Sequence, residues 1–333
     1  MLMFKKYKTL EDKLLIFCQE NLQRITCKIV SKFFPANRLQ EVRILSGGVF
    51  NVSYLLILQK DLKVVLRVAP SQKFLVGYQH NLMQAEYLAY EFCRKYKVPS
   101  PNVYTIDDSF EITDRIYMLS EYIPSIPLNK VYLPMDTLLH CYREAGEAVR
   151  KMHSILGSRF GRLAIQLENG GFDTWSEAIL YEVNMWLQIF SYLKILPQKV
   201  IEAIRNVFED HVDILNKVIS PHLAHGDLWN GNLLIFLHNK NYLFRAIIDV
   251  DHAIFGDPEI DFFCGKMLND SFVQGYGKDL DTNWEAFIRR RLYLLLFTIR
   301  QCYVYKYVHC DLTSGNEQIK HIYHFLSEFN KKF

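Results

Sequence analysis

The stretch HGDLWNGN at residues 225–232, followed by the apolar run LLIF at 233–236, carries the most specific pattern in this chain of 333 residues. Further on, AIIDVD at residues 246–251 is a second short apolar run that leads directly into acidic residues. Apolar runs of this length, bounded by Gly, Asn and Asp, are typical of short strands. The pattern therefore predicts that two strands fix the backbone and that the acidic and amide side chains project from their ends.

Asp227, Asn232 and Asp249 supply the groups that phosphoryl transfer requires. This reaction asks the protein for positioning and charge neutralisation, with a carboxylate to accept the hydroxyl proton. Mg²⁺ is a hard ion that takes oxygen ligands. The spacing His-x-Asp-Leu-x-x-x-Asn equals that of the protein-kinase catalytic loop, with Gly226 where those enzymes have Arg. We therefore expect an ATP- and Mg²⁺-dependent kinase, in which Asp227 is the general base and Asn232 and Asp249 bind the metal.

The alternative is that these residues only form turns, which Asp and Asn favour for local hydrogen-bonding reasons. The agreement of spacing, order and flanking apolar runs favours the catalytic interpretation. His225 either orients the loop through a hydrogen bond or simply packs, and we expect a structural role. Asp251 and Asp257 are expected to be ordinary polar loop residues rather than metal ligands.

Together, HGDLWNGN and IIDVDHAIFGDPEIDFF at residues 247–263 resemble the aminoglycoside phosphotransferase superfamily, which includes choline kinases and fructosamine kinases. The His-Gly-Asp form and the Asp-x-x-x-Asp tail separate this group from protein kinases. The resemblance implies the same base and metal ligands, and it implies that Asp261 braces the catalytic loop. It extends over nearly the whole chain in order and spacing, but only the block at 225–261 is highly specific. The implied architecture is α+β, a bilobal protein-kinase-like fold.

A glycine pair, Gly47-Gly48, lies between two predicted strands and is followed by Asn51. Glycines let backbone N–H groups approach phosphates, although Gly-Gly between strands usually marks only a hairpin. The segment departs from the G-x-G-x-x-G form but resembles the Gly-Gly-x-x-Asn loop of small-molecule kinases. We expect these three residues to cover the phosphates of the nucleotide.

Arg67 lies in the predicted strand at 64–68, where kinases have the lysine that contacts the α- and β-phosphates. A guanidinium is always charged and can bind phosphate with two parallel donors. Lys63 is the competing residue but is expected to be solvated. Glu86, early in the next predicted helix, is the expected partner of Arg67, with Glu91 as the alternative.

The run at residues 117–123 looks like the hinge that binds adenine through its backbone, and this assigns nucleotide contacts to Glu121 and Ile123. Pro124 and Pro127 come next in the chain, and beyond them long helical patterns replace the strands. We therefore expect residues 1–120 to form the nucleotide-binding lobe with a leading helix, and 121–128 the link. Residues 129–333 would form a helical lobe with the catalytic loop and the acceptor site.

Apolar periodicity gives the elements in each predicted lobe. Strands are predicted at 42–45, 52–58, 64–68, 102–107 and 115–120, with helices at 9–34 and 80–96. In the second lobe, helices are predicted at 135–155, 174–194, 197–218, 283–308 and 315–330.

Composition excludes several classes of protein. The net charge of +3 and the absence of a basic tract with interleaved aromatics give no support to nucleic-acid binding. The 7 cysteines are scattered without a C-x-x-C pair, which favours reduced thiols in the cytoplasm over disulfides or a zinc site. No apolar run approaches the ~20 residues needed to span a bilayer, so we expect no membrane segment. The sequence leaves the oligomeric state open.

The acceptor is the least determined feature. Glu177, Tyr181, Glu182 and Trp186 fall partly on one predicted helix face, although core is the commoner role for such a set. Trp229 follows the base and could border the acceptor. By analogy with relatives, we expect a small hydroxyl compound, with a slight preference for a cation.

Two other classes remain open from the sequence alone. A pseudokinase acting as a binding module would lack the base or one of the metal ligands, and all three are present. A protein kinase would show an Ala-Pro-Glu segment and a long activation loop, whereas Asp261 follows Asp249 after only twelve positions.

Overall fold

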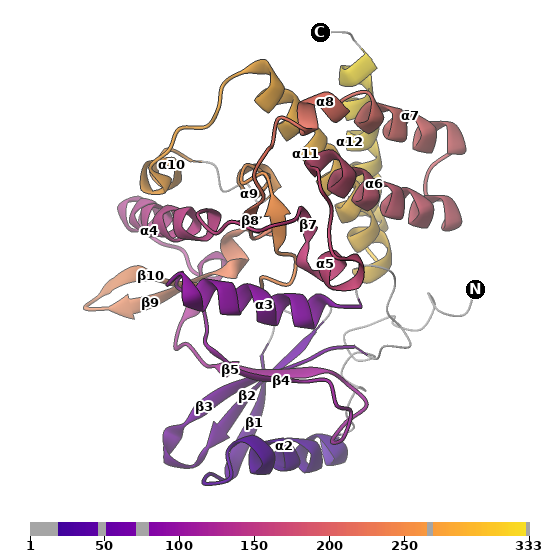
Figure 1. Cartoon of the computed structure of the whole chain (residues 1–333). Helices are drawn as coiled ribbons and strands as arrows, with labels where there is room; N and C mark the ends of the chain where they lie inside the picture. Colours follow the sequence, from indigo (N-terminus) through magenta and orange to yellow (C-terminus); the bar gives the residue numbers. More distant parts are fainter. Residues whose placement is uncertain (1–18, 46–50, 71–79, 265–268, 331–333) are drawn as a thin grey trace.

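The computed structural model describes residues 19–45, 51–70, 80–264 and 269–330, and a β-sheet region lies against a larger helical region within it (Figure 1). The predicted leading helix appears as α2 (Gln19–Phe33) over its described part. The glycine pair Gly47-Gly48 falls outside the described residues.

The N-terminal region is built on a 5-stranded sheet with the order β1-β2-β3-β5-β4, in which all neighbours are antiparallel. Its strands are β1 (Leu39–Leu45), β2 (Val52–Leu58), β3 (Lys63–Val68), β4 (Val103–Asp107) and β5 (Tyr117–Glu121). Each strand predicted from the sequence is present, with its ends shifted by a few residues at most.

Two helices cover this sheet, which explains why β2 reads as a continuous apolar run. The helix α2 packs Ile25 and Ile29 against Leu56 and Leu66 of the sheet. The helix α3 (Leu82–Lys95) lies between the sheet and the helical region (Figure 1). Side chains alternate along a strand, so β3 directs Leu66 toward α2 and the neighbouring Arg67 toward α3.

Asp107 joins α2 to the edge of the sheet through several hydrogen bonds. Its carboxylate accepts from Lys32 Nζ at 2.9 Å, Tyr117 Oη at 2.8 Å and Ser109 Oγ at 2.7 Å. Burial would raise the pKa of Asp107, but the bonds from Ser109, Lys32 and Tyr117 outweigh it and hold that pKa below its ordinary value of 3.8. The ionised carboxylate is therefore the form that stabilises the fold.

A depressed pKa adds stability above the unfolded-state value and loses it as the pH falls through the folded-state value. We expect Asp107→Asn to lower the free energy of unfolding by about 1–3 kcal/mol at neutral pH. The difference from the wild type should shrink below about pH 4. Urea unfolding of both proteins across this range measures it, and a difference that does not depend on pH would contradict the assignment.

The C-terminal region is mainly helical, as predicted. Its helices are α4 (Met135–His153), α5 (Leu163–Asn169), α6 (Trp175–Tyr192), α7 (Gln198–Glu209), α8 (Val212–Leu215), α9 (Ile260–Cys264), α10 (Asp270–Tyr276), α11 (Trp284–Tyr303) and α12 (Leu312–Asn330). The prediction of one continuous helix at 197–218 is wrong. The chain forms two helices, α7 and α8, because His211 between them has non-helical backbone angles. The helix predicted at 283–308 ends at Tyr303 and continues as a π-helical turn, Val304–Val308.

Short strands in this region hold the segments that carry the sequence motifs. The hairpin of β9 (Leu233–His238) and β10 (Asn241–Ile247) pairs with β6 (Ile126–Pro127). A second small sheet has the order β7-β11-β8, formed by β7 (Gly161–Arg162), β11 (Ile254–Gly256) and β8 (His222–Ala224). The motif at 225–232 therefore runs from β8 to β9, and the acidic segment after β10 leads into β11.

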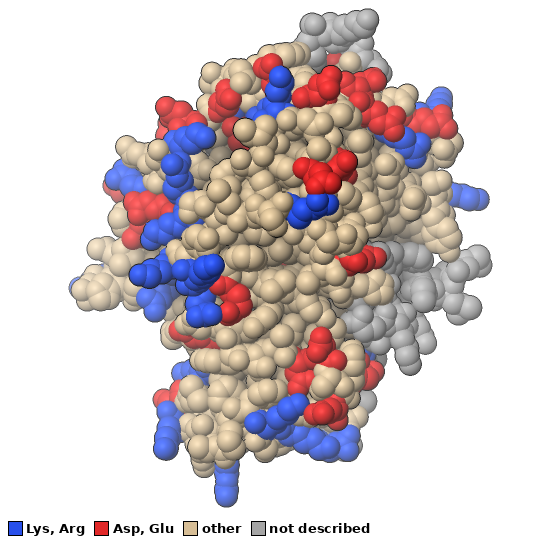
Figure 2. All heavy atoms as spheres, viewed as in Figure 1, with Lys and Arg blue, Asp and Glu red and all other residues tan. Residues whose placement is uncertain are grey.

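The surface shows no broad patch of one charge sign on the face in Figure 2, where Lys and Arg are interspersed with Asp and Glu. Within the described part of the chain, no helix has the length and apolar character needed to cross a membrane.

Candidate active site

His225 connects the two motif segments through hydrogen bonds. Its Nε2 lies 2.9 Å from the Ile248 carbonyl oxygen, and its Nδ1 accepts from the Asp227 backbone N–H at 3.3 Å. This pattern requires a neutral imidazole with its proton on Nε2, which donates to Ile248. His225 is fully buried, and these bonds fit the structural role expected from the sequence.

Asp261, at the start of α9, accepts from both backbone amides that precede the candidate base. The N–H groups of His225 and Gly226 each lie 2.7 Å from its carboxylate, and His153 Nε2 lies at 3.0 Å. Burial would raise the pKa of Asp261. The hydrogen bond from His153 and the Coulomb interaction with the same imidazole outweigh burial and hold that pKa below its ordinary value. Asp261 thus contacts the loop where the sequence predicted a brace, whereas His153 from α4 was not anticipated.

Gly226 has a φ of +77°, and a Cβ added there would lie 2.1 Å from the His252 carbonyl oxygen. Left-handed geometry costs an L-residue roughly 1–2 kcal/mol, and the clash with backbone adds to that cost. The loop therefore has no space for the Arg that protein kinases carry at this position.

Gly226→Ala should lower the free energy of unfolding by roughly 3 kcal/mol or more, because backbone strain and a backbone clash combine. Gly170→Ala is the matched control, since Gly170 has a φ of +82° with nothing within 4 Å of its added Cβ. The control should cost only about 1 kcal/mol. Equal losses for the two variants in denaturant unfolding would contradict this packing of the loop.

Asn232 and Asp249 lie on the two segments that carry the motifs, and hydrogen bonds connect these segments. Asn232 Nδ2 donates to the Asp227 carbonyl oxygen at 2.9 Å. The backbone carbonyl of Asn232 accepts from the Ile248 N–H at 3.0 Å, which joins the two backbones just before Asp249. The candidate base and both candidate metal ligands are therefore held in one hydrogen-bonded unit.

Asp249 has an unusual backbone conformation, with a φ of +64°. Its N–H donates to the Tyr90 hydroxyl of α3 at 3.0 Å, so α3 contacts the acidic segment at this residue. The Asp249 side chain is about one-third exposed (33%). Its carboxylate can therefore reach a ligand outside the protein core.

The donor set of these residues fits Mg²⁺. Because the Asn232 amide nitrogen is used by the Asp227 carbonyl, its amide oxygen is the atom left to face a metal. The described part of the chain has no cluster of three or more His, Cys, Asp or Glu that could hold a metal by itself. Mg²⁺ is usually bound through one or two carboxylates together with substrate phosphates, and Asn232 and Asp249 offer oxygens for that mode.

Arg67 lies among carboxylates where β3 faces α3 and the acidic segment. Its Nε is 2.9 Å from Glu86, and its Nη2 contacts Asp249 and lies 3.4 Å from Asp251. With its amide oxygen turned to the guanidinium, Asn51 accepts from Arg67 at 3.0 and 3.1 Å. The structure therefore forms the ion pair with Glu86 that the sequence predicted.

The competing residues lie elsewhere. Glu91 pairs with Arg94 along α3 at 2.7 Å, and Lys63 is exposed. Burial would lower the pKa of Arg67, but Asp249 and Glu86 raise it well above its ordinary value. Burial also raises the pKa of Glu86 to about 7, although Arg67 acts in the opposite direction. Arg67 thus stays charged at the face of β3 that meets the acidic segment.

The predicted hinge at residues 117–123 comprises β5 and the two residues that follow it. The N–H of Glu121 donates to the Asn102 carbonyl at 2.8 Å, and the Ile123 carbonyl accepts from Ser125 Oγ at 2.8 Å.

Arg300 of α11 is a contact of the candidate base that the sequence did not predict. Its Nη2 donates to Asp227 Oδ1 at 2.8 Å, and its Nη1 donates to the Gly226 carbonyl at 3.2 Å. Arg300 is 5% exposed. The available signal was an arginine at the end of the apolar run at 292–299, where a buried charge requires a partner.

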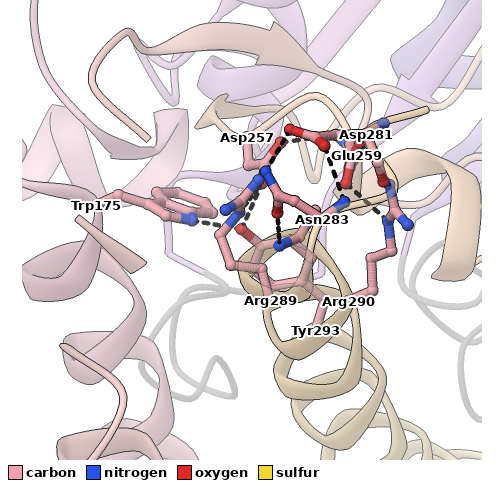
Figure 3. A network of polar contacts seen from close by, with 9 residues as sticks. Trp175, Asp257, Glu259, Asp281, Asn283, Arg289, Arg290 and Tyr293 are labelled. Atoms are coloured by element: carbon pink, nitrogen blue, oxygen red, sulfur yellow. Dashed lines mark hydrogen bonds and ion pairs between the residues drawn. The ribbon is translucent and has the colours of Figure 1, made fainter. Parts of the chain in front are cut away.

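The expectation that Asp251 and Asp257 are ordinary loop residues is wrong, because both are buried. Asp257 accepts from Arg289 Nε at 2.9 Å and from the Tyr293 hydroxyl at 2.8 Å, and Trp175 Nε1 donates to the same hydroxyl at 2.8 Å. Figure 3 shows this network between the start of α11 and Trp175. It fixes α11, the helix that also carries Arg300.

The four residues expected to lie partly on one face of the helix at 174–194 are divided between the surface and the core. Glu177 caps α6 together with Thr174, Tyr181 is 39% exposed and Trp186 is buried. Glu182 is buried as well, and it accepts from Arg162 Nε at 2.9 Å and Nη2 at 2.8 Å. Trp229, two residues after the candidate base, is 43% exposed.

Comparison with solved structures gives relatives of the same fold at low identity. A protein described as a fructosamine-3-kinase from Thermobifida fusca YX-ER1 has a TM-score of 0.65 at 17% identity, covering 92% of this chain and 98% of that one. A thermostable mutant of the aminoglycoside phosphotransferase APH(4)-Ia, in a ternary complex with AMP-PNP and hygromycin B, gives a TM-score of 0.65 at 18% identity and covers 92% of this chain and 99% of that one. A streptomycin–ATP complex of APH(2")-IIa gives 0.62 at 18%, covering 89% and 94%.

These neighbours confirm the predicted kinase-like fold, with a β-sheet N-terminal region and a helical C-terminal region. A search of curated protein sequences gave no match. The family model described as the phosphotransferase enzyme family (APH) matches residues 41–294, from β1 into α11. Because this match spans well over half of the chain and includes the motif at 225–232, the chain belongs to the phosphotransferase enzyme family.

Proposed function

We propose that this protein transfers the γ-phosphoryl group of ATP to a hydroxyl of a small molecule, with Mg²⁺ as the metal. The supporting observation is the hydrogen-bonded unit formed by Asp227, Asn232 and the backbone next to Asp249. It joins a carboxylate, an amide and a second carboxylate at the ends of short strands, which is the set of groups that this chemistry requires.

In the proposed reaction, Asp227 accepts the proton of the acceptor hydroxyl. The hydroxyl oxygen forms a bond to the γ-phosphorus, and the bond between that phosphorus and ADP breaks. Asn232 and Asp249 would hold Mg²⁺, which neutralises phosphate charge. His225 accepts from the Asp227 N–H, and Asp261 accepts from the N–H groups of His225 and Gly226, so these bonds would fix the loop that carries the base.

For the nucleotide, we propose that Arg67 contacts the phosphates and that Glu86 and Asn51 hold its guanidinium in place. Gly47 and Gly48 would cover the phosphates, and the backbone of Glu121 and Ile123 would bind adenine.

We also propose that successive parts of the chain have separate functions. Residues 1–120 would form the nucleotide-binding lobe and 121–128 the link, while 129–333 would carry the catalytic loop and the acceptor site. Aminoglycoside-like, choline-like and fructosamine-like compounds are the acceptor classes to test first, because structural neighbours are named for or bound to two of these classes.

ADP formation from ATP and Mg²⁺ should rise at least about tenfold over the rate with water when the correct acceptor class is added. The panel should contain aminoglycosides, choline-like amines, sugars and fructosamines, with a generic protein substrate alongside. Phosphorylation of the protein substrate and of no compound in the panel would overturn the proposal in favour of a protein kinase.

A further inference from the structure

Arg300 is a contact of the candidate base to which the proposed function gives no role. Its Nη2 donates to Asp227 Oδ1 at 2.8 Å, and its Nη1 donates to the Gly226 carbonyl at 3.2 Å. Among the described residues, it is the side chain that donates to this carboxylate. One guanidinium therefore holds both the candidate base and the residue before it.

Arg300 itself has almost no surface open to a ligand. Its side chain is 6% exposed, whereas that of Asp227 is 30% exposed. The cavity beside it, lined among others by Arg162, Glu182 and Gly226, has a volume of about 10 Å³. A cavity of this size has room for about one water molecule. Any effect of Arg300 on a reaction must therefore pass through the groups that it binds.

The contact makes the two carboxylate oxygens of Asp227 unequal. Oδ1 is bound to the guanidinium, and Oδ2 has no hydrogen-bond donor among the described residues. A general base must lie within roughly 2.6–3.2 Å of the hydroxyl whose proton it takes. A carboxylate that is held by one oxygen cannot rotate freely, so Oδ2 is the oxygen left to accept a proton.

The surroundings of Arg300 restrict its own movement. It lies on α11, where Arg289 and Tyr293 bind the buried carboxylate of Asp257 at 2.9 and 2.8 Å (Figure 3). The guanidinium also packs over the ring of Phe297, at 5.2 Å from its centroid. A functional side chain keeps its geometry when packing and hydrogen bonds fix the residue that supports it. Arg300 is therefore able to hold the carboxylate in one orientation.

The loop that carries the base cannot supply this cation itself. Gly226 stands where protein kinases have Arg, and a Cβ added there would lie 2.1 Å from the His252 carbonyl oxygen. The residues that follow the base, LWNGN at 228–232, carry no charge. The positive charge beside Asp227 therefore comes from α11, 73 positions further along the chain.

We propose that Arg300 is the positioning residue of the base, a role that rests on the proposed phosphoryl transfer. It holds Asp227 Oδ1 so that Oδ2 meets the acceptor hydroxyl, and it contacts neither ATP nor the acceptor. Without the guanidinium, the carboxylate rotates away from the position in which it takes the proton. Its loss therefore slows the transfer step and leaves the binding of both substrates almost unchanged.

Variants of Arg300 test this role with ATP, Mg²⁺ and the most active acceptor of the panel described above. Arg300→Met keeps much of the side-chain length but donates no hydrogen bond. We expect it to lower kcat about 10–100-fold, because a misplaced group costs a reaction rate on this scale. Both KM values should stay within about threefold of the wild type. Arg300→Lys retains one donor group and should recover part of the lost rate.

Arg291→Met is the matched control, because Arg291 lies on the same helix but pairs with Glu328. Its kcat should stay within about twofold of the wild type, since it contacts no part of the proposed site. Titration of ATP by calorimetry in the presence of Mg²⁺ shows whether each variant is folded, independently of turnover.

A double-mutant cycle separates positioning from a general structural role. If Arg300 acts through the Asp227 carboxylate, Arg300→Met should lower the residual rate of Asp227→Asn by less than about threefold. An arginine that only stabilised the fold would cause the same fractional loss in both backgrounds. If Arg300→Met does not fold, the cycle is made with Arg300→Lys, whose smaller loss should likewise disappear in the Asp227→Asn background.

Equal losses in the two backgrounds overturn the inference. A loss that lies mainly in KM also overturns it, as does a kcat for Arg300→Met within about twofold of the wild type. Failure of the proposed function has a different signature, because the wild type itself would then bind no ATP in the presence of Mg²⁺ and form no ADP with any acceptor.

Discussion

Asp227→Asn is expected to lower the rate of phosphoryl transfer by about 10²–10⁴, the usual cost of removing a general base. The amide is nearly the same size as the carboxylate and can still accept from Arg300 through its oxygen. The loop should therefore keep its shape, since its other bonds, to His225 and from Asn232, use the backbone of residue 227.

Nucleotide affinity separates this loss from misfolding. Because Asp227 is proposed to contact the acceptor rather than ATP, the variant should bind Mg²⁺–ATP within a few-fold of the wild type. Asp213→Asn, an exposed carboxylate on α8, is the matched control and should retain full turnover. Turnover of Asp227→Asn close to that of the wild type would remove this residue from the role of base.

The parts of the site that the sequence predicted are those with a local spacing. Asp227 and Asn232 lie on one loop, so the short stretch of chain between them already limits how far apart the two side chains can be. Asp249 follows the strand β10. The pairing of β10 with β9 places Asp249 at the end of the hairpin where Asn232 precedes β9. The sheet of the N-terminal region was predicted for a similar reason, since alternation and turn residues are local signals.

The contacts that were missed join residues far apart in the chain. Arg300 reaches Asp227 over 73 positions, and His153 reaches Asp261 over 108. No spacing rule predicts such pairs, because they depend on how α4 and α11 pack around the loop at 225–232. Asp257 was misjudged for the same reason, since its partner Arg289 comes from α11 and turns a loop residue into a buried ion pair.

Asp249→Ala is expected to remove most of the increase in ATP affinity that Mg²⁺ gives the wild type, a loss of about 10–100-fold. The physical reason is that Ala has no side-chain oxygen to bind the metal. Without Mg²⁺, the same variant should bind ATP at least as tightly as the wild type. Asp249 contacts Arg67 directly, and its removal leaves that guanidinium with one carboxylate fewer and more attractive to phosphate.

The opposite effects with and without Mg²⁺ make the result specific. Simple misfolding would weaken ATP binding in both conditions, whereas loss of a metal ligand weakens it in one. Titration of ATP by calorimetry, once with Mg²⁺ and once with a chelator, gives both affinities. Glu91→Ala serves as the control, because it removes a carboxylate that is paired with Arg94 on α3. If Asp249→Ala kept the full Mg²⁺ enhancement, another residue would have to be the principal ligand. Asp251 would be the next to test, because it lies 3.4 Å from the same guanidinium and is carried by the same segment.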